Sequence, residues 1–262
     1  MVSFDIIGSR DKAVAIVEIP KGLKKSKKDV AKEILESNKN VKSVIEKISA
    51  RKGKLRKREY RLLLGEKNTE VLHKEFGYIL KLDPKKVYFS PREATERQRI
   101  AEQMKPDEII LTMFGGISVS SIAIAKKQPN VNKIYSVELN PAAHEYALEN
   151  VRINKLSHKI IPIMGDVNKV CKEFYNKCDR VLMPLPLEAG KFLDTAVRCL
   201  KDEGGVIHFY SIGDEEDLFS KALKTIDKEL KKLNKTYTVI NKKKVLPYSP
   251  GQFKICIDLM VK

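Results

Sequence analysis

Four short motifs place turn-forming or polar residues where a nucleotide-like ligand could bind. Gly115-Gly116 precedes a helical stretch, so backbone amides at this turn can approach a ligand closely. Glu138 follows Gly116 by 22 residues, the spacing at which an acid meets the ribose hydroxyls of a bound nucleotide. Asp166 could accept a hydrogen bond from an adenine amino group, and Pro184 lies in the fourth motif, Met183-Pro184-Leu185-Pro186. Each motif alone could equally be a cap, a turn or a strand end.

These motifs would meet if each followed a strand of one parallel sheet. Apolar runs predict five strands, at residues 109–114, 133–138, 159–163, 180–185 and 206–212. Helical patterns alternate with them, at residues 119–127, 142–154, 188–200 and 215–233. This alternation predicts an α/β, doubly wound sheet, in which ligands bind at the carboxyl ends of the strands. Two closing segments, 237–246 and 252–261, indicate a final antiparallel hairpin, which is typical of Rossmann-like methyltransferases rather than dehydrogenases.

The first 92 residues have a different pattern and predict a small α+β module. A strand pair is expected over residues 3–19 and a helix over 27–35, while 41–48 could be either a helical stripe or a short strand. Three short strands are expected at 70–72, 77–82 and 87–90. The chain therefore divides into a module at 1–92 and a catalytic domain at 93–262.

The charge of the chain favours a polyanionic partner. Among 262 residues there are 51 Lys and Arg but 34 Asp and Glu, a formal net charge of +17. Residues 47–61 hold eight basic residues and one acid, next to Tyr60, which suits a nucleic acid because phosphate contacts release counterions. A second stretch, 221–244, holds nine Lys and two acids, and we interpret it as a solvated helix face.

Several other classes of protein are disfavoured. Apolar runs such as 206–212 fall short of the ~18 residues of a membrane span, and the N-terminus has no signal-peptide pattern. The four cysteines lack metal-ligand or CxxC spacing, so we expect reduced thiols, a cytoplasmic location and no metal. His208 lies in an apolar strand and is expected to be a packed core residue.

Motifs in both parts of the chain resemble those of one family. In order they are Leu55-Arg56-Lys57-Arg58-Glu59, Leu64 to Thr69, His73-Lys74-Glu75, Val87 to Arg92, Glu96-Arg97, Met113 to Gly116, Glu138 to Pro141, Asn150 to Leu156, Gly165 to Val167, Gly204 to Tyr210 and Tyr248-Ser249-Pro250. The sequence resembles the archaeal and eukaryotic tRNA (guanine-37 N1) methyltransferases over nearly its whole length. The family's usual extra N-terminal domain, which helps to check tRNA shape, has no counterpart in it.

The resemblance implies S-adenosyl-L-methionine as methyl donor, a guanosine of the tRNA anticodon stem-loop as acceptor, and a class I methyltransferase fold. It assigns the general base to Glu96, and stabilisation of the guanine carbonyl oxygen to Arg56. Donor-binding positions are Tyr88, Arg97, Phe114, Gly115, Gly116, Glu138, Leu139, Asp166, Val167 and Pro184. Expected tRNA contacts are Lys52, Lys54, Lys57, Arg58 and Arg92, in a protein that we expect to act as a monomer.

The chemistry supports these residue types. Guanine N1 carries a proton at neutral pH, so methylation there needs a base and a positive group near the carbonyl oxygen. Without the resemblance, Glu96 would be interpreted as a surface acid at a helix start, and Arg56 as one more phosphate contact.

Three positions depart from the family pattern and leave alternatives open. Thr112 stands where the family has an acid, and Gly116-Ile117-Ser118 stands where it has a G-x-G pattern. Pro184 stands where the family has Asn or Asp near the target base. Two rival functions follow: transfer of the donor's aminocarboxypropyl group in wybutosine-type modification, or a tRNA-binding paralogue with weak or no catalysis. The basic motif at 55–59 and Pro186 favour methyl transfer over the first rival.

Overall fold

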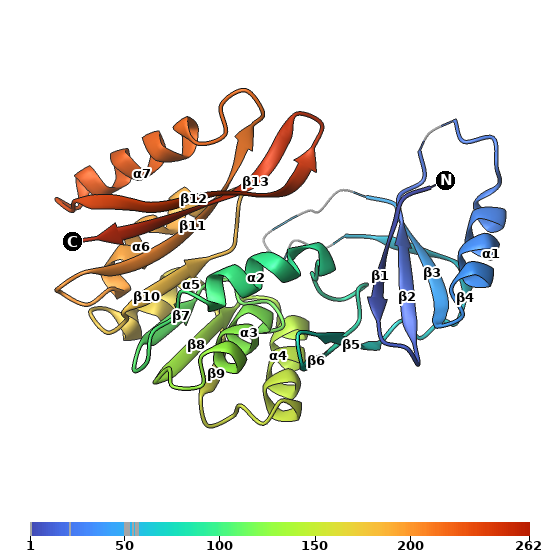
Figure 1. Cartoon of the computed structure of the whole chain (residues 1–262), viewed down its shortest axis with the longest axis horizontal. Coiled ribbons are helices and arrows are strands. Elements are labelled where there is room, and N and C mark those ends of the chain that lie inside the picture. Colours follow the sequence, from blue (N-terminus) through green and yellow to red (C-terminus); the bar gives the residue numbers. More distant parts are fainter. Residues whose placement is uncertain (1, 21, 50–52, 54, 56–57) are drawn as a thin grey trace.

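The computed structural model describes every residue except 1, 21, 50–52, 54, 56 and 57. Its described residues form a four-stranded sheet near the N-terminus and a seven-stranded sheet in the remainder (Figure 1). A two-stranded hairpin and helix α2 connect the two sheets along the chain.

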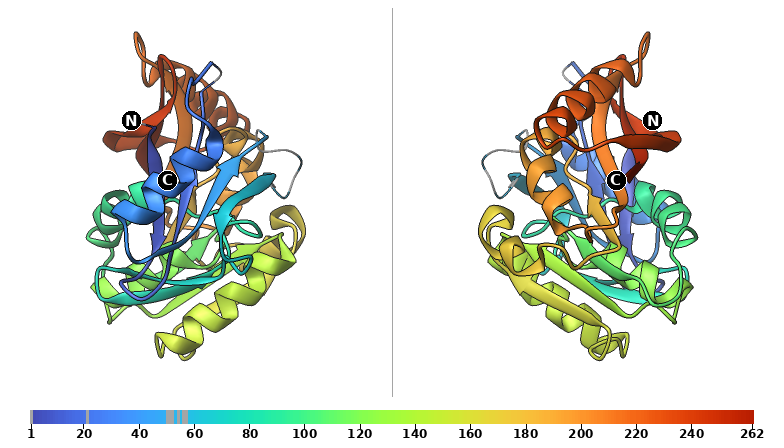
Figure 2. Two further views of the ribbon diagram at one scale, coloured as in Figure 1. Left: turned by 90° about the vertical axis from the view of Figure 1, so that its right-hand side faces the viewer. Right: turned by 90° about the vertical axis from the view of Figure 1, so that its left-hand side faces the viewer.

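The N-terminal sheet has the strand order β1-β2-β3-β4 and is covered by one helix (Figure 2, left). Its elements are β1 (Phe4–Gly8), β2 (Ala13–Val17), α1 (Lys27–Ser37), β3 (Val41–Lys47) and β4 (Tyr60–Gly65). Ser26 caps α1, because its side chain accepts a hydrogen bond from the amide of Asp29 at 3.1 Å. The apolar face of α1, with Val30 and Ile34, is buried against the sheet.

Two parts of this module sharpen or correct the sequence-based expectations. The segment predicted as a helical stripe or a short strand forms strand β3 over Val41–Lys47, with Val44 and Ile45 fully buried. Strand β4 is not predicted from the sequence, since most of its residues are only half-buried and charged residues flank it. A strand with such weak alternation gives little periodic signal.

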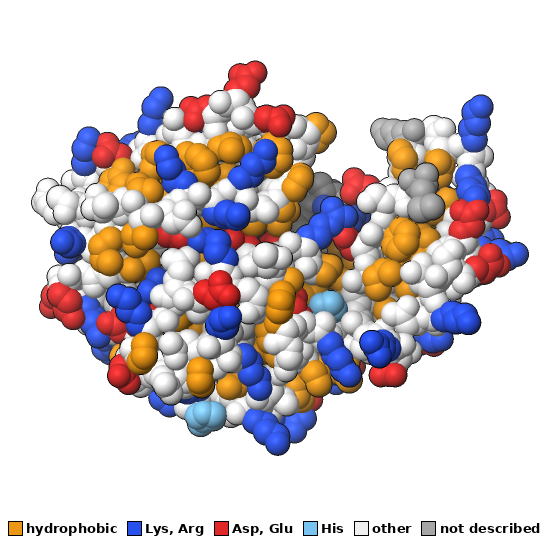
Figure 3. Space-filling view, viewed as in Figure 1, with side chains coloured by type: hydrophobic (Ala, Val, Ile, Leu, Met, Phe, Trp, Pro, Cys, Tyr) orange, Lys and Arg blue, Asp and Glu red, His pale blue; other side chains and the backbone are white. Residues whose placement is uncertain are grey.

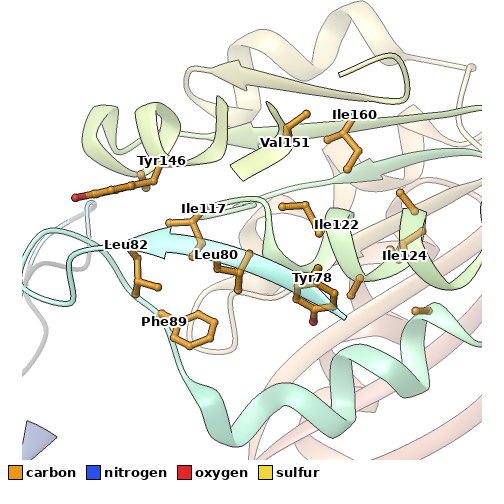
Figure 4. Packing of buried hydrophobic residues seen from close by; sticks show 14 of the residues in the cluster. Tyr78, Leu80, Leu82, Phe89, Ile117, Ile122, Ile124, Tyr146, Val151 and Ile160 are labelled. Atoms are coloured by element: carbon orange, nitrogen blue, oxygen red, sulfur yellow. The ribbon is translucent and has the colours of Figure 1, made fainter. Parts of the chain in front are cut away.

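A hairpin of β5 (Val71–Glu75) and β6 (Tyr78–Leu82) packs against the large domain. The side chain of Asn150 accepts from the amide of Lys81 at 2.6 Å and donates to its carbonyl at 3.1 Å. Asn154 forms the same pair of bonds with Ile79, at 3.1 and 2.6 Å. Leu80 packs in the apolar cluster that Figure 4 shows. The side-chain amides thus satisfy the open edge of the hairpin, which holds it to the large domain.

The large sheet has the order β12-β13-β11-β10-β7-β8-β9. Strands β7 to β11 are parallel to one another, and β13 pairs antiparallel with both β11 and β12. Its strands are β7 (Ile109–Thr112), β8 (Lys133–Glu138), β9 (Ile160–Met164), β10 (Arg180–Met183), β11 (Gly205–Asp214), β12 (Tyr237–Ser249) and β13 (Gln252–Val261). Its helices are α2 (Ala94–Ala101), α3 (Val119–Lys127), α4 (Pro141–Ile153), α5 (Val167–Val170), α6 (Leu193–Cys199) and α7 (Ser220–Lys232). This arrangement confirms the predicted Rossmann-like methyltransferase fold with its closing hairpin.

Both faces of the large sheet are covered by helices. One buried apolar cluster joins α2, α3 and α4 to one face, and a second joins α6 and α7 to the other (Figures 1 and 2). Neighbouring strand residues alternate between the clusters: Ile110 and Leu182 belong to the first, Leu111 and Val181 to the second. A sheet covered on both faces leaves its carboxyl edge as the place for a ligand.

One predicted element is wrong, and another begins later than predicted. Residues 87–90 are a connecting segment rather than a strand; Val87 and Phe89 alternate with exposed Tyr88 because the segment packs along the core edge. Helix α7 begins at Ser220 instead of residue 215, and the side chain of Asp217 accepts from the amide of Ser220 at 3.2 Å. Among the described residues, no helix is long and apolar enough to cross a membrane.

Candidate active site

The loop after β7 lies directly against β8. A Cβ atom at Gly115 would come within 2.2 Å of the Ser136 hydroxyl, so only glycine fits there. Gly116 has a φ of +57°, and nothing lies within 4 Å of the place where its Cβ would be. The loop is therefore packed tightly on its β8 side and has open space in front of Gly116.

Glu138 connects this loop to the next one. Its carboxylate accepts from the amide of Gly116 at 2.8 Å and from the amide of Asn140 at 2.7 Å. Burial raises the pKa of the Glu138 carboxyl above its ordinary value, although the amides of Asn140, Gly116 and Leu139 act in the opposite direction. A carboxylate offers about four lone-pair sites, so acceptor capacity remains for a hydroxyl group.

The loop after β9 lies beside the same residue. The amide of Gly165 donates to the carbonyl of Glu138 at 2.9 Å, while Asp166 caps α5 by accepting from the amide of Asn168 at 2.9 Å. The structure thus gathers the predicted residues of three loops at one edge of the sheet: Phe114, Gly115, Gly116, Glu138, Leu139, Asp166 and Val167.

Two buried hydroxyl pairs lie beneath the glycine loop. Thr112 is fully buried and accepts from Ser121 at 3.3 Å, so its side chain points into the packing against α3. Ser118 donates to Ser136 at 2.8 Å and adopts a φ of +61°, a conformation uncommon for a residue with a Cβ. These hydroxyls fill the positions where the resemblance leads one to expect an acid and a glycine. Sequence reasoning did not identify Ser121 and Ser136.

Pro184 follows β10, the strand next to β7. It lies within a tight turn, in which the amide of Leu185 donates to the carbonyl of Met183 at 2.8 Å. Because β10 pairs directly with β7, Pro184 is one strand away from the glycine loop. Phe114, in that loop, packs edge-on against Phe192, with ring centroids 4.8 Å apart.

Arg97 and Tyr88, two further predicted donor-binding residues, have other partners. Arg97 is 6% exposed; its Nε donates to Glu75 at 2.8 Å, and its guanidinium also donates to the carbonyl of Ser90 at 3.2 Å. Burial opposes ionisation of Glu75, but hydrogen bonds from His73, Arg97 and Tyr78 lower its pKa to about 2. Arg97 thus ties α2 to the β5–β6 hairpin.

Tyr88 is exposed, and its hydroxyl donates to Glu93 at 2.7 Å. The hydrogen bonds of Tyr88 and Arg97 described above thus go to Glu93, Glu75 and Ser90.

Glu96, the predicted base, is buried at the start of α2. The guanidinium of Arg99 donates two hydrogen bonds of 2.7 Å to its carboxylate, and the Tyr210 hydroxyl donates a third at 2.8 Å. Burial above all raises the pKa of the Tyr210 hydroxyl, so this group stays protonated and remains a donor. Arg99 could have been found from its spacing of three residues on a helix. Tyr210 lies on a distant strand and gives no such signal.

Tyr210 also fixes the place of Glu96 relative to the sheet. Phe209 pairs with Met183, the last residue of β10, so Tyr210 lies just beyond the carboxyl end of that strand. Strand β11 is two strands from β7, or about 10 Å at the usual strand spacing. The carboxylate of Glu96 therefore lies near the same edge as the glycine loop.

Most of the predicted tRNA-binding residues lie outside the described residues: Lys52, Lys54 and Lys57, together with the predicted catalytic Arg56. Arg58 is half-buried in the described part of this segment. Arg92 is exposed and pairs with Asp5 at 2.5 Å, which links the segment before α2 to β1. Figure 3 shows Lys and Arg side chains in the notch between the N-terminal module and the large domain.

His208 is fully buried, as the sequence predicts for a core residue, but it is not surrounded by apolar groups alone. Its Nδ1 lies 2.7 Å from Asp258, and its Nε2 lies 3.0 Å from Arg180. With Cys256 and Asp258 it brings three potential metal ligands within 4.8 Å of one another. Arg99 donates to Asp258 and Arg180 contacts His208, so two of the three groups already have guanidinium partners.

Comparison with known proteins agrees with this geometry. The sequence model of the TRM5/TYW2 methyltransferase domain matches residues 71–240, and that of the TYW2 N-terminal domain matches residues 2–69. The tRNA (guanine(37)-N(1))-methyltransferase Trm5b of Pyrococcus abyssi is 40% identical over 259 residues, which cover 99% of this chain and 74% of the relative.

Two solved structures are similar over nearly the whole chain. The complex of aTrm5 and tRNALeu has a TM-score of 0.86 and 38% identity, and covers 99% of this chain and 72% of its own. The M. jannaschii TYW2 in complex with AdoMet has a TM-score of 0.76 and 26% identity, and covers 99% of both chains. The fold, the strand-edge loops and these matches agree: the chain belongs to the TRM5/TYW2 methyltransferase family.

Proposed function

We propose that this protein transfers a methyl group from S-adenosyl-L-methionine to N1 of guanosine 37 in the anticodon loop of tRNA. One observation carries the proposal: the buried carboxylate of Glu96 is held by Tyr210 near the sheet edge at which Gly116, Glu138 and Asp166 gather. A proton acceptor and a nucleotide cradle at one edge are what an N-methylation needs. The family relationship to Trm5b supplies the substrate.

The residues present fit the donor. The open space in front of Gly116 gives an adenosine group access to the loop, and Glu138 retains acceptor capacity for ribose hydroxyls. Asp166, with one carboxylate oxygen used as a helix cap, can accept from the adenine amino group. When bound, S-adenosyl-L-methionine supplies an electrophilic methyl group next to a positive sulfur. M. jannaschii TYW2, a structural relative, holds AdoMet.

The hydrogen bonds of Glu96 support its role as the acceptor of the guanine N1 proton. Three hydrogen bonds, two from Arg99 and one from Tyr210, occupy three of its roughly four lone-pair sites, and Oε2 keeps one free. Negative charge then moves to the guanine carbonyl oxygen, where a positive group stabilises the transition state. The family resemblance gives that role to Arg56, which lies outside the described residues.

The basic segment around residues 47–61 supports tRNA binding by the N-terminal module. Lys52, Lys54, Lys57, Arg58 and Arg92 would contact phosphates, in keeping with a net charge of +17. The relative aTrm5 forms a complex with tRNALeu. We also propose a boundary near residue 92 between the tRNA-binding module and the catalytic domain.

We infer that the protein acts as a monomer in the cytoplasm. All four cysteines are free and buried, a usage that fits a reducing compartment.

Aminocarboxypropyl transfer is the second candidate, and one observation favours it: residues 2–69 match the TYW2 N-terminal domain. Both reactions use the same donor but break different carbon–sulfur bonds. Incubation of unmodified tRNA carrying guanosine 37 with donor labelled in the methyl group, and separately in the carboxyl group, separates the two. We expect methyl label at position 37 and none from the carboxyl-labelled donor.

A tRNA with adenosine 37 is the matched control and should stay unlabelled. Carboxyl label on a wyosine-type substrate would favour the second candidate. Donor and tRNA binding without any transfer would identify a binding paralogue, as the departures at Thr112 and Pro184 suggest.

A further inference from the structure

Arg99 lies between two buried carboxylates and binds both. Its Nε and Nη2 donate to Glu96, each at 2.7 Å, and its Nη1 donates to Asp258 at 2.6 Å. Asp258 is on β13 and has no exposed surface. The single positive charge of Arg99 is therefore shared between the predicted base and a second acid that lies deeper in the core.

Asp258 is itself fixed by a chain of further polar and charged side chains. His208 bonds to its Oδ1 at 2.7 Å, and Gln103 donates to its Oδ2 at 3.1 Å. Arg180 contacts the other nitrogen of His208 at 3.0 Å and pairs with Glu108 at 2.7 Å. The chain thus runs from Tyr210 through Glu96 to Glu108 across the sheet.

The protonation state of His208 follows from its partners. A guanidinium can only donate, so Nε2 of His208 must accept from Arg180, and Nδ1 must carry the proton that is donated to Asp258. Burial, together with the nearby Arg180 and Arg99, lowers the pKa of His208, in keeping with a neutral ring. Burial alone would raise the pKa of Asp258, but His208 and Arg99 hold it below its ordinary value. Asp258 is therefore a permanent negative charge.

The groups that face Glu96 come from three elements: Arg99 on α2, Tyr210 on β11, and Cys256 and Asp258 on β13. Lys254, also on β13, donates a hydrogen bond to Glu93 at 2.8 Å. Among these described neighbours, Asp258 is the one ionised acid that competes with Glu96 for Arg99. Both carboxylates bind the same guanidinium, so Asp258 draws part of the positive charge of Arg99 away from Glu96.

We propose that Asp258, oriented by His208, is a positioning residue that holds Arg99 in place and shares its charge, so that Oε2 of Glu96 can accept the proton of the substrate base. This inference rests on the proposed function, because it assumes that Glu96 is the base. Asp258 acts through Arg99 and does not itself touch the substrate.

The test is the pH profile of the single-turnover methyl-transfer rate in Asp258→Asn, measured on the full chain with saturating donor and tRNA. Removal of the Asp258 charge leaves the whole positive charge of Arg99 facing Glu96. We expect the acidic limb of the profile to move to lower pH, with a lower plateau and unchanged donor affinity. A merely structural role would lower the rate without moving the limb.

Gln103→Ala is the matched control, because Gln103 bonds to the same carboxylate but carries no charge. Its profile should keep the wild-type limb, and a limb that stays in place in Asp258→Asn as well would overturn the proposal. If Asp258→Asn does not bind donor, Arg99→Lys decides: the charge remains but cannot bridge both acids. A rate lower by roughly tenfold with donor and tRNA affinity retained supports the proposal, and the full rate refutes it.

Failure of the proposed function gives a different pattern. If the wild-type protein transfers no methyl group to guanosine 37, or if Glu96→Gln reacts at the wild-type rate, the assignment of Glu96 as the base is excluded. If Glu96→Gln is inactive but the acidic limb of the pH profile does not move in Asp258→Asn, only the positioning role of Asp258 is excluded.

Discussion

Two glutamates of the candidate site, the half-buried Glu138 and the buried Glu96, are held in opposite ways. Glu138 accepts hydrogen bonds from the backbone amides of Gly116 and Asn140, which belong to the loops that it joins. Within the part of the chain that the structure describes, Glu96 is held by side chains, from Arg99 on its own helix and Tyr210 on β11. The first carboxylate depends on the course of the backbone, and the second depends on which side chains the fold brings together.

The difference suits the two roles. A group that recognises a ligand can be fixed by backbone amides, because it does not change its protonation state during binding. A base must take up a proton, so its neighbours must tolerate both of its charge states, and shared side-chain charges can do this. Substitutions should therefore affect rate at Glu96 and affinity at Glu138.

The largest effect is expected for Glu96→Gln. The amide keeps the size of the side chain but cannot accept the guanine proton, so the single-turnover rate should fall by ~10²–10⁴-fold. Donor affinity, measured by calorimetry, and tRNA affinity at fixed salt should stay close to those of the wild type.

Glu102→Gln is the control, since Glu102 lies at the end of the same helix and pairs with Lys127 at 2.9 Å on the surface. A Glu96→Gln enzyme as fast as this control would exclude Glu96 as the base. Arg56→Ala should lower the rate in a similar way, because stabilisation of the carbonyl oxygen also belongs to the transition state.

Glu138→Ala should weaken donor binding instead. Each lost charge-assisted hydrogen bond to a ribose hydroxyl costs roughly 1.5–3 kcal/mol, or about ten- to 150-fold in affinity. The variant Glu149→Ala removes a surface glutamate that pairs with Arg152 and should bind the donor normally. Calorimetric titration with S-adenosyl-L-methionine compares the two, and equal affinities would place Glu138 outside the donor site.

The same carboxylate predicts a pH effect. Burial raises the pKa of Glu138, so it takes up a proton at a higher pH than an ordinary glutamate, whose pKa is about 4.3. The ionised form is the better acceptor for ribose hydroxyls, so donor affinity should fall as the pH falls through this raised pKa. Donor affinity in Glu138→Gln should vary less over the same acidic range, and equal pH dependence in both proteins would contradict the assignment.

The contrast between the two glutamates also explains how far the sequence could predict the structure. The alternation of strands and helices from Ile109 onward, the closing hairpin and the Gly116–Glu138 spacing all follow local patterns, and the structure confirms that these residues meet. Strand β4 was missed because its residues are half-exposed. Tyr210 and Asp258 were missed because their contacts join residues more than 100 positions apart, for which a single sequence carries no periodic signal.

Removal of positive charge from the N-terminal module should weaken tRNA binding without changing donor affinity or the rate of the chemical step, which depend on Glu138 and Glu96. Replacement of Lys52, Lys54 and Lys57 by Ala should make the dependence of log affinity on log salt shallower by roughly 0.7–0.9 per lost phosphate contact. Replacement of Lys221, Lys224 and Lys228 on α7 removes the same charge from a helix that we interpret as solvated. Binding titrations at several salt concentrations should show a changed slope in the first variant alone.

The smallest effect is expected for Pro184→Asn, although it restores the side chain that the family pattern has at this position. Pro184 lies inside the tight turn closed by the amide of Leu185 and the carbonyl of Met183, and proline fixes the backbone angle φ in such turns. An asparagine there would add a donor but would also loosen the turn beside the glycine loop. We therefore expect no gain in the single-turnover rate, which would indicate that the site works with proline and that proton transfer depends on the Glu96 side-chain network. A clear rise in rate with unchanged donor affinity would show instead that the base is already well placed, and that the missing amide is what limits the wild-type reaction.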